Sequence, residues 1–453
     1  MSESPWKTHR DPGDETSARG RPKSAADAQA ERAQEKSDTL PLRPSRQGPR
    51  RRPVVQVLGD GQSMASLLAP YTVPFDDALV IGRRASTGSP AGAGAGAGTG
   101  APAGGSGPIH LVVADRRVSA RHACIARAPR AGAGATATWT PSEAFMLEDT
   151  DSTNGTFIDG VPISGPTPIR DGSLVFLGSH ALVFRLVTPA EQAALEEEAA
   201  RPFGPLATRA PKLALATARL RGLARSRAEI LLAGETGVGR RGFAEAIHAF
   251  SGRSGNLVAV DASEIPRPEL ESRLFGSGVL VAGGSENAPA LLDGLAGGGT
   301  LFVDDIDAVP APVQERLLRI GLDGRLSWYG STSAVDVEVQ VIAGTNRVGL
   351  GSETSATDQR PTAWEAVQPV VLPPLRERVE DIGPQAAGIL RKFGRPRAVS
   401  AGPVFEPAAW GALLLHGWPL NLIELSEVLQ AALEANGGGP IGLAHLPDRI
   451  VHG

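Results

Sequence analysis

The stretch that decides the fold is Leu232-Ala-Gly-Glu-Thr-Gly-Val-Gly-Arg-Arg241. Its glycines follow a short aliphatic run, and their spacing is typical of a loop whose backbone N–H groups turn inward around phosphate oxygens. Such a loop ordinarily ends in a lysine, followed by a small hydroxyl residue that ligates magnesium. Here Arg240 and Arg241 hold those two positions. The loop therefore predicts a phosphate-binding fold in which the two residues that would contact phosphate and magnesium are replaced.

The exchange at position 240 keeps the charge and alters the geometry. A guanidinium is planar and forked, whereas an ammonium is a compact point charge, so Arg240 is not a conservative replacement for lysine. Arg241 offers no oxygen to a metal ion. The loop leaves the binding of ATP or ADP open, with magnesium held weakly if at all. No residue is predicted to be catalytic, and none is predicted to be a metal ligand.

The chain on either side of this loop alternates helical stretches with buried-strand runs. The runs are 229–233, 257–260, 300–303 and 337–343. This alternation favours a parallel sheet with helices on both faces. Beyond residue 376 the pattern is helical only. We therefore predict a P-loop α/β core over 205–376 and a helical lid over 377–453.

The N-terminal half has a different pattern. Short apolar runs at 78–81, 110–113, 144–147 and 173–176 are separated by Gly, Pro, Asn and Asp. This pattern predicts an all-β sandwich over 53–188.

Three segments flank or interrupt the sandwich. Residues 1–52 are polar and carry almost nothing apolar, which predicts a disordered tail. The Gly/Ala/Pro-rich stretch 85–108 is predicted to be a loop on the rim. Thr188, Pro189 and Glu191 form a capping-box pattern, which predicts a helical linker over 189–204 that serves as a spacer.

Bulk composition excludes several classes of protein. The 453 residues carry 45 basic and 49 acidic side chains, a net charge of −4, so the whole chain has no electrostatic attraction to nucleic acid or membrane. A single cysteine excludes an intrachain disulfide framework. No apolar stretch reaches the length of a membrane span. We expect a cytoplasmic protein that does not enter a membrane.

The predicted sandwich carries three motifs in order. They are Ile81-Gly-Arg83, Val118-Ser-Ala-Arg-His122 and Asp151-Ser-Thr-Asn-Gly-Thr-Phe157. This combination resembles the forkhead-associated (FHA) domain over 53–188. The resemblance implies that Arg83 and Ser119 bind the phosphate of a phosphothreonine, that Asn154 holds the peptide backbone, and that Thr153 is a further peptide contact. Arginine and hydroxyl groups are suitable charge-assisted donors to a phosphate dianion.

Two further features bear on the role of the predicted peptide site. His122 has no nucleophile beside it in sequence, so a structural hydrogen-bonding role is expected rather than catalysis. Ala120 stands where the family often has arginine, and the insertion borders the binding face. The alternative is a sandwich that keeps the motif and binds no phosphate.

The C-terminal half carries further motifs besides the loop, at 271–276, 298–305, 341–347, 372–378 and 417–421. Together they resemble the AAA+ domain of sigma-54-dependent transcription activators over 205–453. The resemblance implies ATP hydrolysis in the family. It also implies a nucleotide-binding site, which we expect to be vestigial in this chain. The positions of that site are Gly234, Glu235, Thr236, Gly237, Val238, Gly239, Arg240, Arg241, Asp304, Asp305 and Asn346.

Several parts of that machinery are absent from this sequence. Asp305 stands where the family has glutamate, and losing one methylene retracts the carboxylate by roughly 1.5 Å. Residues 355–371 contain only Arg360 where two arginine fingers are expected, and Ile423 replaces the sensor arginine of the lid. The slot at 280–285 lacks the Phe and Thr of the sigma-contacting loop. We therefore predict a degenerate module without ATPase activity.

These features favour a regulatory adaptor. In this reading the FHA domain docks a phosphothreonine protein from a Ser/Thr kinase pathway, and the AAA+ module is a nucleotide sensor or a protein-interaction scaffold. The alternative is an ATP-hydrolysing sigma-54-dependent activator controlled by its FHA domain. One further candidate partner is an AAA+ paralogue that assembles with this chain. Another is the chain itself, whose FHA domain would bind a tail phosphothreonine at Thr8, Thr16 or Thr39 of the same or another copy. No direct DNA binding is expected, because no helix-turn-helix follows the lid in this sequence.

Overall fold

The structure is a computed structural model in which residues Pro49–Gly453 form one compact unit. It describes residues 51–83, 108–128, 144–204, 207–276, 291–295, 298–327, 334–347, 362–364, 366–393 and 404–452. The predictions for the tail up to residue 50, for nearly all of the insertion, for the slot at 280–285 and for Arg360 lie outside these residues. Within the described residues, no helix has the length and apolar character needed to cross a bilayer.

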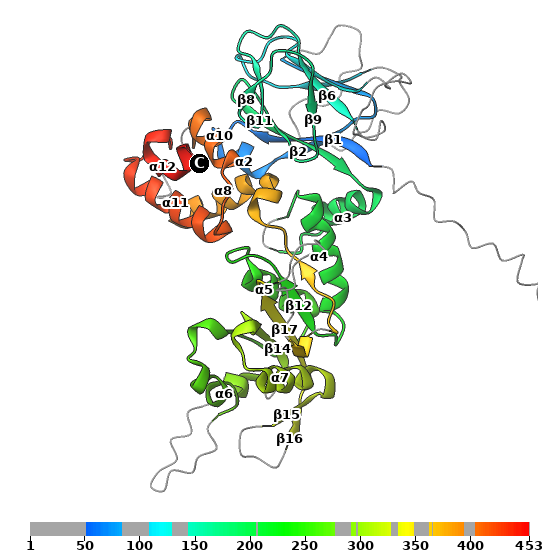
Figure 1. Ribbon diagram of the computed structural model, residues 1–453, viewed down its shortest axis with the longest axis vertical. Coiled ribbons are helices and arrows are strands. Elements are labelled where there is room, and N and C mark those ends of the chain that lie inside the picture. Colours follow the sequence, from blue (N-terminus) through cyan, green and yellow to red (C-terminus); the bar gives the residue numbers. More distant parts are fainter. Residues whose placement is uncertain are drawn as a thin grey trace, which may run out of the picture. The chain divides into compact units, whose positions relative to one another are not determined.

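The first domain consists of two β-sheets (Figure 1). One sheet has the order β2-β1-β11-β10-β7-β8 and the other β4-β3-β5-β6-β9. Their strands are β1 (Arg52–Gly59), β2 (Tyr71–Pro74), β3 (Ala78–Gly82), β4 (Ile109–Val112), β5 (Ala123–Arg127), β6 (Phe145–Asp149), β7 (Thr156–Ile158), β8 (Val161–Pro162), β9 (Thr167–Ile169), β10 (Leu174–Leu177) and β11 (His180–Val187). The all-β prediction is confirmed, and each predicted run overlaps a strand. Strand β1 begins at Arg52, the last residue of the predicted tail.

The two central strands β1 and β11 are buried on both faces. A strand of an antiparallel sandwich usually alternates buried and exposed side chains, yet every residue of β1 after Arg52 is buried. Val55 and Val57 point into the core between the two sheets. Leu58 of β1, and Ala181 and Val183 of β11, belong to a different core that they share with C-terminal helices. The face of this sheet that points away from the sandwich core is therefore covered by C-terminal helices.

The linker helix α3 (Pro189–Ala200) begins as predicted. The Thr188 side chain accepts a hydrogen bond from the backbone of Glu191, whose carboxylate accepts in return from the Thr188 backbone. The helix is not a free spacer, however. Glu198 is buried, and it accepts hydrogen bonds from Arg221 and Thr217 of α4 (Pro211–Ala224). That buried ion pair fixes α3 against α4.

The α/β core has a parallel five-stranded sheet of order β13-β14-β17-β12-β18. The strands are β12 (Ile230–Ala233), β13 (Asn256–Asp261), β14 (Gly299–Asp304), β17 (Val339–Thr345) and β18 (Val370–Val371). A separate antiparallel pair is formed by β15 (Arg325–Ser327) and β16 (Ala334–Asp336). Alternate strand residues belong to two apolar clusters, one with α4 and α5 (Arg240–Ser251) and one with α6 (Arg267–Phe275) and α7 (Ala311–Asp323). The predicted fold class is confirmed.

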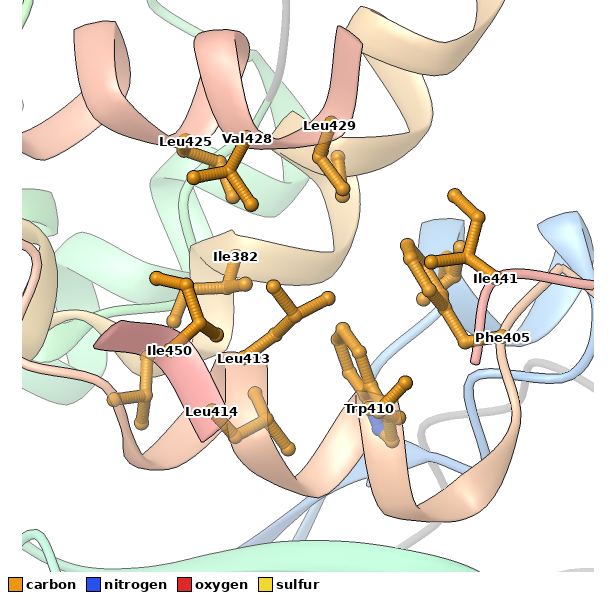
Figure 2. Close-up of a cluster of buried hydrophobic side chains, with 14 of the residues drawn as sticks. Ile382, Phe405, Trp410, Leu413, Leu414, Leu425, Val428, Leu429, Ile441 and Ile450 are labelled. Carbon is orange, nitrogen blue, oxygen red and sulfur yellow. The ribbon is translucent and has the colours of Figure 1, made fainter. Parts of the chain in front are cut away.

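The last domain is helical, as predicted. Its main helices are α8 (Ile382–Phe393), α10 (Pro407–Leu415), α11 (Asn421–Ala435) and α12 (Asp448–Val451). Their apolar side chains converge in one cluster (Figure 2). The short helix α2 (Met64–Leu68), inserted between β1 and β2, adds Leu67 to that cluster.

Polar contacts join the sandwich to the lid as well. The backbone N–H of Val404 donates to Gln62 O (2.9 Å), and that of Phe405 donates to Gly61 O (3.0 Å). Arg185 of β11 donates to both carboxylate oxygens of Glu380, at 2.5 and 2.9 Å. The Arg185 side chain is 9% exposed and the Glu380 side chain is fully buried. The sandwich and the lid are thus joined by a shared apolar core, backbone hydrogen bonds and a buried ion pair.

Candidate functional sites

Loops at the ends of β3, β4 and β6 bring the predicted phosphate-binding residues together. The backbone N–H of Arg83 donates to Ser119 O at 2.9 Å. Ser119 Oγ accepts a hydrogen bond from the backbone N–H of Thr153 at 3.1 Å and lies 3.5 Å from its Oγ1. The Arg83 and Thr153 side chains are exposed. The three residues therefore share one solvent-facing surface.

Asn154 and His122 complete the arrangement. Asn154 Nδ2 donates to Arg117 O at 2.6 Å, so it holds the loop that carries Ser119. His122 is buried, and its Nδ1 accepts from the Ser119 backbone N–H at 3.0 Å. Its Nε2 lies 3.2 Å from Gly155 O, so this nitrogen carries the proton and donates. The predicted structural role of His122 is confirmed.

Gly82 is required by a close approach of two loops. A Cβ at this position would lie 2.2 Å from Ala120 O and 3.0 Å from Arg121 Cα. Any side chain would therefore push the Ser119 loop away from Arg83.

Asp115 anchors the loop before Ser119, although it belongs to none of the three sequence motifs. Its carboxylate accepts hydrogen bonds from the backbone N–H of Arg117 (2.8 Å), and from the Ser179 backbone (2.8 Å) and hydroxyl (2.6 Å). Burial alone would raise the pKa of Asp115, but these hydrogen bonds, with one from His180, lower it to about 2. The only sequence signal for this role was the position of an aspartate shortly after a predicted strand. A charged anchor of this kind keeps Ser119 in place.

The phosphate-binding-type loop connects β12 to α5. Gly237 and Gly239 have φ values of 77° and 106°, which non-glycine residues rarely adopt. The backbone N–H of Gly234 donates to Thr345 O at 3.0 Å, and that of Val238 donates to Glu235 O at 3.1 Å. The loop thus has the turn that its glycines predict.

Arg240 is held entirely by groups of the protein itself. It is 6% exposed. Its Nε donates to Asp304 Oδ1 at 2.5 Å, one terminal nitrogen donates to Asp305 Oδ1 at 2.8 Å, and the other donates to Gly234 O at 2.7 Å. The guanidinium thus bridges both carboxylates that follow β14. Burial raises the pKa of Asp305, Arg240 opposes that rise, and neighbouring aspartates add to it.

The predicted nucleotide-contacting residues Arg241 and Asn346, and the neighbouring Thr345, are placed differently. Arg241 is exposed and pairs with Glu245 one turn along α5 at 3.4 Å. Thr345 is buried and donates its hydroxyl to Asp307 at 2.6 Å. Asn346 is exposed at the end of β17. Of the three, none joins the Arg240 network.

Two segments of the chain, at 376–378 and 420–422, contact the loop directly. Arg376 donates to both carboxylate oxygens of Glu235, at 2.8 and 2.5 Å. Asn421 Nδ2 donates to Thr236 O at 3.0 Å, and the buried Arg378 donates to Val238 O at 2.6 Å. A Cβ at Gly237 would lie 2.1 Å from Leu420 O. The loop backbone is therefore packed against the start of the lid, and sequence patterns did not predict these contacts.

A magnesium ion does not fit the residues at this site. The ion would have to compete with the Arg240 guanidinium for Asp304 and Asp305. Arg241, in the position of the usual hydroxyl ligand, has no oxygen in its side chain. The chemistry of the donor set favours an internal cation over a divalent metal.

The geometry defines two modules, a sandwich with a phosphopeptide-type loop surface and a P-loop α/β core with a helical lid. Family models agree with both: the FHA domain matches residues 102–178, and the sigma-54 interaction domain matches residues 206–360. The chain contains an FHA domain followed by the AAA+ core of a sigma-54 interaction domain.

Known proteins resemble the second module. The chain is 35% identical over 230 residues to the response regulator protein FleR of Pseudomonas aeruginosa, covering 49% of this chain and 48% of FleR. It is 34% identical over 233 residues to the regulatory protein AtoC of Escherichia coli, covering 50% of each. The crystal structure of NtrX from Brucella abortus in complex with ATP is 25% identical, covering 57% of this chain and 61% of NtrX, with a TM-score of 0.46. The chain spans about half the length of these curated relatives.

Proposed function

We propose that the protein is a phosphothreonine-reading regulator of transcription in the cytoplasm. Its FHA domain docks a phosphorylated partner of a Ser/Thr kinase pathway, and its AAA+ module acts as an interaction scaffold or nucleotide sensor without hydrolysing ATP. The FHA and sigma-54 interaction models support the two halves of this proposal. The sequence relatives, which are regulatory proteins, support the transcriptional output.

The observation that carries the loss of hydrolysis is the Arg240 network. Phosphoryl transfer needs clustered positive charge and a magnesium ion at the transferred group. In this chain the charge at position 240 is neutralised by Asp304 and Asp305 before any nucleotide arrives. The same two carboxylates are then unable to hold magnesium or to orient water. ATP or ADP would have to bind through the loop backbone alone.

A second candidate is an ATP-hydrolysing sigma-54-dependent activator that its FHA domain controls. Its support is the 35% identity to a response regulator across the AAA+ module and the intact glycine turn of the loop. In that case Arg240 would have to leave both aspartates when nucleotide binds. Measured turnover separates the two candidates.

The peptide-binding half is tested by replacing Arg83 with alanine. We expect Arg83→Ala to weaken phosphothreonine-peptide binding by about ten- to a hundredfold, because a charge-assisted hydrogen bond to phosphate is worth about 1.5–3 kcal/mol. The probe is a degenerate phosphothreonine peptide library, titrated against the full-length protein by fluorescence anisotropy.

Two controls complete that experiment. The same library with unphosphorylated threonine should not bind, and Arg83→Lys should retain part of the affinity, since it keeps the charge without the fork. Circular dichroism must show that Arg83→Ala stays folded. Equal affinity of Arg83→Ala and the natural protein would place the phosphate site elsewhere.

A further inference from the structure

The loop that carries Ser119 is unusually rich in arginine. Arg116, Arg117 and Arg121 flank it within five residues of sequence, and Arg83 lies across from it. All of these arginines are exposed. The net charge of the chain is −4, so the cluster is a local feature rather than a consequence of a basic protein.

Backbone contacts place two of these arginines beside the predicted phosphate-binding residues. Arg117 O accepts from Asn154 Nδ2 at 2.6 Å, which puts Arg117 beside the peptide-holding residue. Arg121 Cα lies 3.0 Å from where a Cβ of Gly82 would stand, next to Arg83. The backbones of Arg117 and Arg121 thus lie close to Asn154 and Gly82, on either side of Ser119 in the sequence.

Carboxylates that lie close in sequence do not neutralise this cluster. Asp115 is used by Ser179 and the Arg117 backbone. Asp149 accepts from the backbone and hydroxyl of Ser152 and from the Thr156 hydroxyl. Across 51–83, 108–128 and 144–204, the four arginine side chains form no ion pair. Like charges that gather without counterions raise the local potential and favour an anionic ligand.

We propose that this FHA domain selects phosphothreonines that are flanked by further negative charge. The flanking charge would come from Asp or Glu side chains, or from a second phosphorylated residue. Arg83 and Ser119 take the phosphothreonine, and Arg116, Arg117 and Arg121 pair with the flanking anions, since arginine binds carboxylate and phosphate bidentately. This proposal rests on the phosphothreonine-reading function proposed above.

The test uses the full-length protein and phosphothreonine peptides of equal length. Their flanks are neutral, acidic, basic or carry a second phosphothreonine. We expect acidic and doubly phosphorylated peptides to bind about tenfold more tightly than the neutral peptide in 50 mM salt. Because exposed charges are screened within roughly 5 Å at 0.5 M, the difference should shrink at that salt concentration.

The matched variant is Arg116→Ala/Arg117→Ala/Arg121→Ala. It should lose the preference for negative flanks, so that the neutral, acidic and doubly phosphorylated peptides bind with equal affinity. Arg121→Gln alone is the second variant, should the triple variant not fold, and it should lose part of that preference.

The outcomes separate the two proposals. Equal binding of neutral and acidic peptides would overturn the charge selection and leave the phosphothreonine site intact. Binding of none of the peptides would overturn both. A preference for the doubly phosphorylated peptide alone would support the proposal and assign the flanking charge to phosphate.

Discussion

Glu380→Ala should lower the free energy of unfolding by about 3–5 kcal/mol, the range for removing one partner of a buried ion pair. Arg185 would remain buried in β11, after losing both hydrogen bonds to the carboxylate. Its bond to Glu377 O at 3.0 Å cannot neutralise the charge. The loss should appear in urea unfolding followed by tryptophan fluorescence, because the buried Trp410 and Trp418 lie in the lid.

The exposed pair Lys212–Glu377 is the matched control. Its nitrogen and oxygen are 2.7 Å apart, but Lys212 is 60% exposed. Lys212→Ala should cost no more than about 1 kcal/mol, as surface pairs do. A Glu380→Ala variant that is as stable as Lys212→Ala would contradict the account in which the sandwich and lid form one body.

Arg240→Ala should destabilise the α/β core by about 3 kcal/mol, because it leaves Asp304 and Asp305 adjacent and without their cation. The two carboxylates are 20% and 28% exposed, so solvent offsets only part of the repulsion. Magnesium should then recover some of the loss. We expect 10 mM Mg²⁺ to raise the Tm of this variant and to leave the Tm of the natural protein unchanged.

Arg241→Ala provides the comparison for a neighbouring arginine. Arg241 is 70% exposed and pairs only with Glu245 of its own helix, so its removal should cost about 0.5 kcal/mol or less. If magnesium raises the Tm of the natural protein as much as it raises the Tm of the Arg240→Ala variant, the guanidinium does not occupy the place of a metal ion.

The motifs predicted the parts that depend on local sequence. Strand runs, glycine turns and the Thr188 capping box are short-range features, and all are present. The predicted phosphopeptide-binding residues Arg83, Ser119, Thr153 and Asn154 lie together because they stand in loops of one sandwich, and their role stays a prediction. Asp115 was missed because its partners Ser179 and His180 lie more than 60 residues away.

The nucleotide site shows the limit more clearly. The sequence indicated that the charge at Arg240 could still attract phosphate. It did not reveal that Asp304 and Asp305 lie within hydrogen-bonding distance of it, 64 and 65 residues along the chain. The Arg185–Glu380 pair spans 195 residues. Such pairings depend on how segments far apart in the sequence pack together, and no periodicity in a single sequence reports that.

The most direct test of the account is ATP binding and hydrolysis by the purified full-length protein, with and without a phosphothreonine peptide, beside Arg240→Lys. We predict no turnover above the protein-free rate in any condition, including Arg240→Lys, because Asp305 and Ile423 still replace the catalytic glutamate and the sensor arginine. Peptide-stimulated turnover by the natural protein would contradict the account and establish an active ATPase.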